Sequence, residues 1–122
     1  MVKRIHHLPV YVKDFQKNLE FYTEVMGFRV VGTPTDKNLK ARFLKAGDTL
    51  LELMDQSQFT RPCEFNLVVD NIEKEIESLK KKGMKIGETE DFPMVEGSLK
   101  FVFFKKFDGS WMELLERKNW NP

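Results

Sequence analysis

The chain has 122 residues, which suffices for one compact domain or for two small modules that share a core. Hydrophobic residues make up 41% of it and include 11 Phe, so a substantial core can form. Charged residues reach 32%, yet the formal net charge is only +1. This balance argues against a protein that binds the phosphate backbone of nucleic acids, because no basic excess would drive counterion release.

The single cysteine, Cys63, excludes a disulfide within the chain and a zinc site built from cysteines. Its use as a nucleophile is a weak alternative, since no histidine lies near it in the sequence. Residues 1–7 lack the apolar segment of a signal peptide, and no stretch approaches a membrane span. We therefore expect a cytoplasmic protein that binds neither a membrane nor a nucleic acid.

The first half of the chain predicts the element order β-α-β-β-β. Residues 5–12 predict a strand, which Pro9 restricts to an edge or irregular position. Asp14 can cap a helix that Gly27 ends. The apolar stripe of that helix has helical spacing: Phe15, Leu19, Tyr22 and Met26. Three more strands are predicted at residues 28–32, 40–45 and 49–54, the last two joined by a tight turn at residues 47–48.

The same pattern restarts after a polar linker at residues 55–62. Asp70 or Asn71 caps a second helix, which Gly83 ends. Ile72, Ile76 and Leu79 form the apolar face of this helix. The predicted strands of this half lie at residues 64–69, 99–105 and 111–115. A further strand is predicted to begin at residues 84–87. A loop passes through Pro93 and Gly97, a turn lies at residues 108–109, and the polar tail of residues 117–122 is expected to fray.

The two halves match in spacing as well as in order, which is typical of a duplicated supersecondary unit. His7 lies seven residues before Asp14, and Glu64 lies seven before Asn71. One half has too few elements to cover both faces of its sheet, so the halves are expected to fold together. If the repeat is real, His7 and Glu64 are equivalent positions.

Glu52 and Glu113 are the equivalent pair at the other end of the repeat, each alone in the middle of an apolar strand. A buried carboxylate needs a cation, a hydrogen-bond network or a bound proton. The alternative is that both strands are half-exposed and both glutamates face water. His7 likewise has the alternative of being a packed histidine without a ligand, whereas His6 points to the opposite face of its strand.

The chain resembles the vicinal oxygen chelate superfamily, which includes glyoxalase I, bleomycin-resistance proteins and extradiol dioxygenases. The opening residues 5–14, IHHLPVYVKD, are similar to the family's first strand and helix cap. Residues 19–22, LEFY, and 25–28, VMGF, are similar to its passage from helix to strand. Residues 50–53, LLEL, and 107–114, FDGSWMEL, are similar to its module-ending strands.

This resemblance implies an α+β fold of two tandem βαβββ modules, which form a curved, cup-shaped mixed sheet with the helices outside. We expect one domain over residues 1–122, with module 1 at about 4–55 and module 2 at about 62–117. The resemblance also implies a homodimer.

In that family a metal is held by the first and last strands of each module. Carried over, the candidate ligands are His7, Glu52, Glu64 and Glu113, although the family's metal enzymes usually have histidine where this chain has Glu64. One imidazole and three carboxylates suit Mn²⁺, Mg²⁺ or Fe²⁺ somewhat better than Zn²⁺ or Ni²⁺. Three carboxylates exceed the charge of one dication, so one could be protonated, lie elsewhere or act as a base.

The function that the resemblance implies is a metal-dependent lyase or isomerase, similar to lactoylglutathione lyase, that acts on a small oxygenated substrate. Glu113 is the first candidate for the base that moves a proton and Glu52 the second. The alternative is a metal-free, non-catalytic protein of the bleomycin-resistance type that sequesters an aromatic molecule. A dioxygenase is a third reading, disfavoured because the chain lacks a second histidine ligand. The expected substrate-binding residues are Tyr11, Phe101, Phe103 and Trp111, whereas Phe43 is expected in the core.

Overall fold

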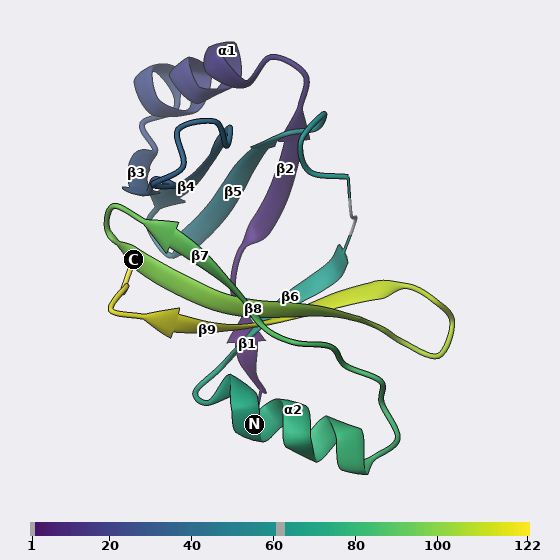
Figure 1. Cartoon of the computed structure of the whole chain (residues 1–122). Coiled ribbons are helices and arrows are strands. Elements are labelled where there is room, and N and C mark those ends of the chain that lie inside the picture. The colour runs from purple at the N-terminus through teal and green to yellow at the C-terminus, as the bar shows by residue number, and fades with distance from the viewer. Residues whose placement is uncertain (1, 61–62) are drawn as a thin grey trace. The chain divides into compact units, whose positions relative to one another are not determined.

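The computed structural model describes residues 2–60 and 63–122, apart from the side chain of residue 64. Contacts between Cα atoms divide the chain into two compact units. The N-terminal unit consists of His7–Thr60, Pro93–Gly97 and Pro122, and the C-terminal unit consists of the described residues within Met1–His6, Arg61–Phe92 and Ser98–Asn121. Each unit contains one sheet and one α-helix that packs on a face of it (Figure 1). Over the described ranges, no helix is long and apolar enough to cross a membrane.

The N-terminal unit is built on a four-stranded mixed sheet. Its strands are, in spatial order, β2 (Leu8–Val12), β5 (Thr49–Asp55), β4 (Ala41–Ala46) and β3 (Arg29–Gly32). Strands β2 and β5 run parallel, whereas β4 is antiparallel to both β5 and β3. Strand β2 lies at the edge, as Pro9 predicts, because a proline cannot donate to a neighbour on both sides.

Helix α1 (Phe15–Glu20) covers one face of this sheet and begins as predicted. The Asp14 side chain accepts a hydrogen bond from the Lys17 backbone N–H at 3.1 Å, which caps the helix. Phe15 packs in a cluster with the inward-facing leucines of the sheet, Leu44, Leu51 and Leu53. Residues Leu19 and Tyr22 of the predicted stripe pack against the same cluster.

Met26 departs from the predicted stripe and is 56% exposed. The helix widens after Glu20 into a π-helical turn, η1 (Phe21–Val25), in which the Met26 N–H donates to the Phe21 carbonyl five residues back. The extra residue per turn rotates Met26 out of the α-helical phase. Gly27 then ends the helix with a φ of 79°, as its position predicts.

The C-terminal unit repeats this arrangement with a five-stranded sheet. Its strands are, in spatial order, β1 (Val2–Ile5), β6 (Cys63–Val69), β9 (Trp111–Lys118), β8 (Gly97–Lys105) and β7 (Glu90–Met94). Strands β6 and β9 run parallel, as β2 and β5 do, whereas β8 is antiparallel to β9. The duplicated pattern of the sequence is therefore a duplicated sheet topology.

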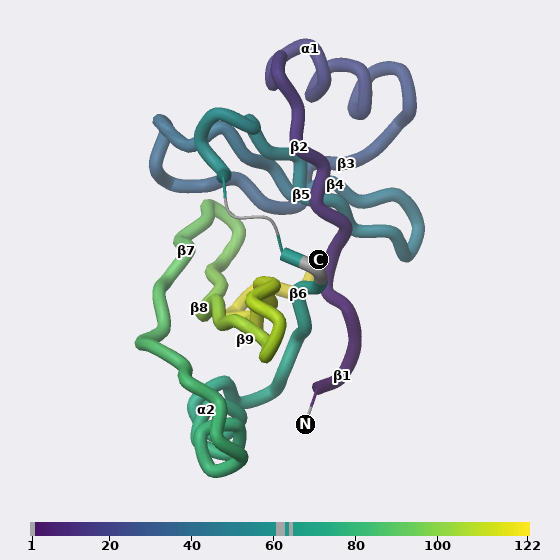
Figure 2. Tube along the Cα trace, turned by 90° about the vertical axis from the view of Figure 1, so that its right-hand side faces the viewer, coloured from purple at the N-terminus to yellow at the C-terminus, as the bar shows by residue number. Residues whose placement is uncertain are grey.

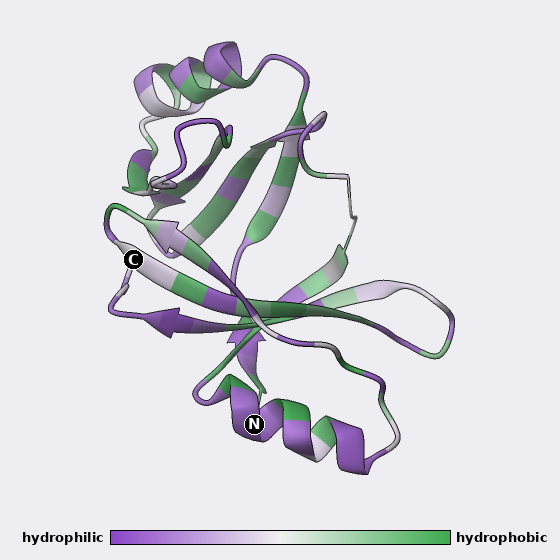
Figure 3. Cartoon of the chain, viewed as in Figure 1, coloured by the Kyte–Doolittle hydropathy of each residue, from purple (hydrophilic) through white to green (hydrophobic). Residues whose placement is uncertain are grey.

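Helix α2 (Ile72–Lys81) packs on one face of this second sheet, where Ile72 and Ile76 join a buried cluster with Leu114 of β9. Figure 3 shows hydrophobic and hydrophilic bands alternating along the helix, which is the pattern of a helix with one buried side. Of the two predicted caps, Asn71 is the one used, and its side chain accepts from the Lys74 N–H.

The single strand predicted at residues 5–12 is wrong, because the structure breaks it into β1 and β2. Strand β1 pairs antiparallel with β6 in one sheet, whereas β2 pairs with β5 in the other. The break falls at His6 and His7, which are both buried. Figure 2 follows this N-terminal segment as it leaves one sheet and enters the other. The composition of residues 5–12 is typical of a strand throughout, so the sequence did not indicate that the chain changes sheet at this point.

The strand predicted to begin at residues 84–87 is also wrong. This segment has no strand pairing, and Ile86 instead inserts its side chain into the core beneath α2. The strand at this point in the repeat is β7, and it contains Pro93, which the sequence placed in a loop. Pro93 is tolerated because β7 lies at the sheet edge.

The C-terminal tail does not fray as predicted. Strand β9 continues to Lys118, and Trp120 is only 6% exposed. The Trp120 ring contacts the His6 ring at a centroid distance of 5.4 Å. Burial of this large indole therefore fixes a segment that looks polar in the sequence.

Candidate active site

His7 and Glu52 form a buried polar contact on the sheet of the N-terminal unit. His7 Nε2 lies 3.0 Å from Glu52 Oε1, and their side chains are 3% and 14% exposed. His7 immediately precedes β2, and Glu52 lies at the centre of β5, which pairs with β2. The partner that a carboxylate in this apolar strand requires is thus an imidazole.

The surroundings of this pair face away from α1. Glu52 lies in register with Pro9 of β2 on one side and with Phe43 of β4 on the other. Phe43 is 1% exposed, and its ring meets the His7 imidazole edge-on at 5.1 Å between centroids. Packing on Phe43, as expected of a core residue, holds the imidazole in place beside the carboxylate.

Glu113 occupies the corresponding position in the C-terminal unit. It lies in β9, in register with Asn66 of β6 and with Phe103 of β8. It is half-buried, and its strand neighbours Met112 and Leu114 face the opposite, α2-covered side. Glu52 and Glu113 are therefore equivalent, as the repeat predicts.

Asn66 is a site candidate that the sequence analysis missed. It is 3% exposed, although it lies in a strand of otherwise mostly apolar residues. Its place beside Glu113 puts an amide next to the second glutamate. A polar residue two positions before Val68, on the same face as Glu113, was the signal in the sequence that could have identified it.

Glu64, the fourth predicted ligand, contributes only its backbone to the described structure, as part of β6. Its side chain lies outside the described residues. As far as the described side chains go, neither unit by itself gathers three or more His, Cys, Asp or Glu side chains into a group suited to a metal. His7 and Glu52 belong to one unit, and Glu113 belongs to the other.

The aromatic residues predicted to bind substrate lie on the same sheet faces as the two glutamates. Tyr11 is 38% exposed and follows Pro9 on its face of β2. The rings of Phe101 and Phe103 meet at 5.6 Å, on the face of β8 that carries the partner of Glu113. Phe103 and Trp111 line a cleft of about 590 Å³ within the C-terminal unit.

Two carboxylates with displaced pKa values, Asp55 and Asp108, lie elsewhere and stabilise turns. Hydrogen bonds from the Ser57 hydroxyl and backbone N–H hold the pKa of Asp55 below its usual value, and Ser110 does the same for the pKa of Asp108. Asp55 is the last residue of β5, and Asp108 lies in the turn that precedes β9. They therefore support the ends of these strands and are not part of the candidate site.

A model of the glyoxalase/bleomycin resistance protein/dioxygenase superfamily matches residues 4–114 of this chain. The chain belongs to that superfamily. The match spans the repeat in both units, and it agrees with the fold class that the sequence predicts.

Two relatives resemble this chain along nearly its whole length. The protein named "Uncharacterized protein YwbC" from Bacillus subtilis strain 168 is 27% identical, and the alignment covers 96% of this chain and all of that protein. A "Probable lactoylglutathione lyase" from Vibrio parahaemolyticus is 28% identical over 94% of this chain and 91% of its own length.

A solved structure of methylmalonyl-CoA epimerase from Streptomyces coelicolor, a variant in complex with 2-nitronate-propionyl-CoA, has the same fold. Its TM-score is 0.71 at 18% identity, and the superposition covers 100% of this chain and 99% of that one. At this identity the likeness concerns the fold alone.

Members of this superfamily often use divalent metals, and the described donors fit such an ion in one respect. A nitrogen and an oxygen that each lie about 2.1 Å from a metal, at right angles, are about 3.0 Å apart. His7 Nε2 and Glu52 Oε1 have that separation. Imidazole and carboxylate are also donor types that Mn²⁺, Fe²⁺ and Zn²⁺ accept.

Proposed function

We propose that this protein is a metal-dependent lyase or isomerase that moves a proton on a carbon next to a carbonyl group of a small oxygenated substrate. The observation that carries the proposal is the buried contact between His7 and Glu52 at 3.0 Å. It is supported by relatives named for lactoylglutathione lyase and by the fold shared with methylmalonyl-CoA epimerase.

In this proposal His7 and Glu52 are ligands of a divalent metal, and Glu64 and Glu113 are the further ligand candidates. The metal would supply Lewis-acid stabilisation of the negative charge that develops on the substrate's oxygens. The packing of His7 on Phe43 fixes the imidazole before the ion binds, so little ordering is needed. This arrangement suits an ion with several oxygen ligands.

Glu113 is the proposed base. Its carboxylate takes the proton from the carbon, the electron pair of the C–H bond moves into the carbonyl group, and the same carboxyl returns the proton to give the product. Glu113 is half-buried and lies beside the Asn66 amide in the sheet, whereas Glu52 already contacts His7. Glu52 is therefore the second candidate for this role.

The test is exchange of the substrate proton with solvent. The protein is incubated in D₂O with Mn²⁺ and either lactoylglutathione or methylmalonyl-CoA, and deuterium incorporation is followed by mass spectrometry. Incorporation that the wild type catalyses and Glu113→Gln does not would support the proposal. Incorporation at the rate of the protein-free control with both substrates, across Mn²⁺, Ni²⁺, Zn²⁺, Fe²⁺ and Mg²⁺, would reject it for these substrates.

The second candidate function is metal-free binding of an aromatic small molecule. The observation that favours it is the cleft lined by Phe103 and Trp111, two aromatic side chains within one unit. In that case ligands would bind equally well with and without a chelator, and no metal would co-purify. A ligand whose affinity falls when the metal is removed would count against this second candidate.

The resemblance to the superfamily also leads us to propose a homodimer. Light scattering of the purified chain checks this directly, since 14.4 kDa is the mass of one chain. A dimer would give about twice that mass, and a concentration-independent mass of one chain would reject it.

A further inference from the structure

The cleft of about 590 Å³ in the C-terminal unit has features of a ligand site in its own right. It lies where the segment after α2, residues 83–87, meets the end of the β8–β9 hairpin. Its volume falls within the usual range of about 300–1,000 Å³ for small-molecule pockets. Every residue that lines it belongs to the same unit, so the cleft is complete within that unit.

The walls of this cleft are apolar and largely aromatic. Met84 lines it from the segment after α2, and Phe103, Phe104 and Trp111 line it from the hairpin. Trp111 is only half-buried, so a large indole surface remains available to a ligand. A flat apolar molecule could cover this surface.

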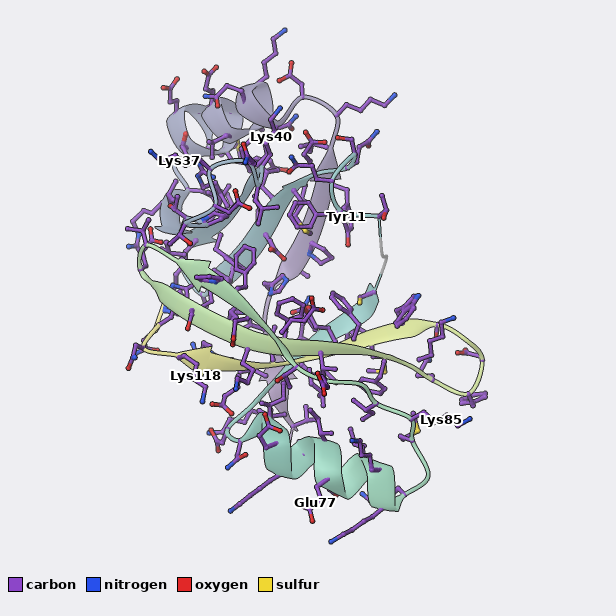
Figure 4. The ribbon with its side chains drawn as sticks, viewed as in Figure 1. Tyr11, Lys37, Lys40, Glu77, Lys85 and Lys118 are labelled. Carbon is purple, nitrogen blue, oxygen red and sulfur yellow. The ribbon has the colours of Figure 1, made fainter. Side chains whose placement is uncertain are left out.

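The charged side chains that line the cleft are all cationic, as far as the described lining residues go: Lys85, Lys105 and Lys106. Lys105 Nζ lies 4.9 Å from the centre of the Trp111 ring, so one ammonium group stands directly over the aromatic wall. Lys106 is paired with Asp108 at 3.8 Å. Lys85 lies on the segment after α2 and is exposed (Figure 4).

The hairpin turn keeps these groups in place. The Lys106 N–H donates to the Ser110 carbonyl at 2.9 Å, and the Gly109 N–H donates to the Lys106 carbonyl at 3.0 Å. Lys105 and Trp111 face each other in register across the hairpin. A cation and an aromatic wall fixed by backbone pairing form a preorganised pair.

We propose that this cleft binds a small organic anion with a flat apolar body, which lies against Trp111 while its carboxylate or phosphate meets Lys105 and Lys85. The lining residues supply an aromatic wall for the flat body and ammonium groups for the anion. A neutral molecule of the same shape would use only the aromatic wall. Since the cleft lies at the end of the β8–β9 hairpin, and Lys105 and Trp111 lie on the same face as Phe103 and Glu113, it extends the face that carries Glu113.

This location bears on the substrate. Trp111 and Glu113 are two residues apart on the same face of β9, which is a separation of about 7 Å. An anion bound by Lys105 could therefore place a reactive carbon near Glu113. That the substrate is such an acid rests on the proposed function, whereas the binding of the anion does not.

The test uses the two indole N–H signals of the protein in ¹H–¹⁵N spectra recorded without metal. The probe is 1-naphthoate, and the matched neutral probe is 1-naphthamide. Naphthoate is expected to shift the Trp111 signal and leave that of buried Trp120 in place. Lys105→Met keeps the apolar stem of the side chain and removes its charge, so it is expected to weaken naphthoate binding about three- to fivefold with little effect on naphthamide.

Lys37→Met is the control for overall charge, because Lys37 is an exposed lysine of the other unit (Figure 4). It is expected to bind naphthoate as the wild type does. Absence of a Trp111 shift at millimolar naphthoate, or equal binding of both probes with no effect of Lys105→Met, would overturn the proposal. The measurement needs neither metal nor turnover. If the protein binds naphthoate but exchanges no substrate proton, the proposal of an anion-binding cleft stands and the proposed function is rejected.

Discussion

Glu52 and Glu113 occupy the same register position in the two sheets. Glu52 lies between Pro9 and Phe43, and Glu113 lies between Asn66 and Phe103. Each glutamate is on the strand that joins a parallel to an antiparallel neighbour, on the face away from its helix. The two carboxylates therefore have equivalent positions, whereas their neighbours on the parallel strand differ, being Pro9 for Glu52 and Asn66 for Glu113.

Glu113, the proposed base, is predicted to be essential for proton exchange. Glu113→Gln is expected to lower proton exchange by a factor of about 10² or more, because an amide cannot take up the proton. Metal-free thermal stability should change little, since Glu113 is only half-buried. The measurement is the deuterium exchange rate with saturating metal.

Glu77→Gln is the matched control for that loss, because Glu77 is 69% exposed on α2 (Figure 4). It is expected to exchange at the wild-type rate. Equal rates for Glu113→Gln and the wild type would remove Glu113 from the catalytic role and leave Glu52 as the candidate.

Gly32 is predicted to tolerate no side chain. A Cβ at this position would lie 2.9 Å from Met94 Sδ and from Cβ and Cδ2 of Phe43, closer than van der Waals contact allows. Gly32→Ala should therefore reduce the free energy of unfolding by about 1–3 kcal/mol, as overpacking typically does. Urea unfolding followed by circular dichroism measures this change.

Gly87→Ala provides the comparison, because a Cβ there meets nothing within 4 Å and the backbone has no positive φ. Its stability is expected to stay within about 0.5 kcal/mol of the wild type. If the two alanine variants unfolded at the same urea concentration, the close packing of Gly32 on Phe43 would be incorrect.

Glu116 is predicted to stabilise α2 in a pH-dependent way. Its Oε1 accepts a hydrogen bond of 2.8 Å from the Ile72 N–H at the start of the helix, and Lys118 pairs with its other oxygen. Burial raises the pKa of Glu116, but the Lys118 and Ile72 hydrogen bonds and the Lys118 and Lys100 charges together bring it below its ordinary value of 4.5. The charged carboxylate is therefore the stabilising form.

Glu116→Gln should cost about 1 kcal/mol of unfolding free energy at pH 7. Because the folded-state pKa is depressed, the contribution is complete above pH 4.5 and is lost as the pH falls through the lower, folded-state value. The stability difference between wild type and variant should thus shrink in acid. A difference that stayed constant from pH 7 to pH 3 would show that the charge of Glu116 is not involved.

Local patterns in the sequence were sufficient for most of the fold. Asp14 and Asn71 cap helices through side chains that accept from backbone N–H groups, and such caps depend on neighbouring residues alone. The switch of sheet at His6 and His7 depends instead on which distant strand each half pairs with. The strand predicted at Ile86 likewise failed, because an apolar side chain can enter the core without strand pairing.

The candidate site was partly accessible from the sequence. A lone Glu52 in an apolar strand predicted a buried partner, and the repeat together with the family resemblance singled out His7, which lies just before β2. Asn66 was missed because the position of one asparagine on a strand face is a weak signal by itself, and its burial is set by tertiary packing. The cleft with Lys105 over Trp111 depends on the register of a hairpin, which residue type alone does not determine.

The most direct test of the proposed metal centre is the metal content and thermal stability of the purified protein. After treatment with a chelator, the chain is reloaded with Mn²⁺, Ni²⁺, Zn²⁺, Fe²⁺ or Mg²⁺, dialysed and measured by elemental analysis, with Glu77→Gln as the control. About one ion per chain and a raised Tm, both lost in His7→Ala and Glu52→Gln but kept in the control, is the predicted result. Absence of bound metal and of any Tm shift in the wild type, or binding unchanged in both site variants, would contradict a metal centre at His7 and Glu52.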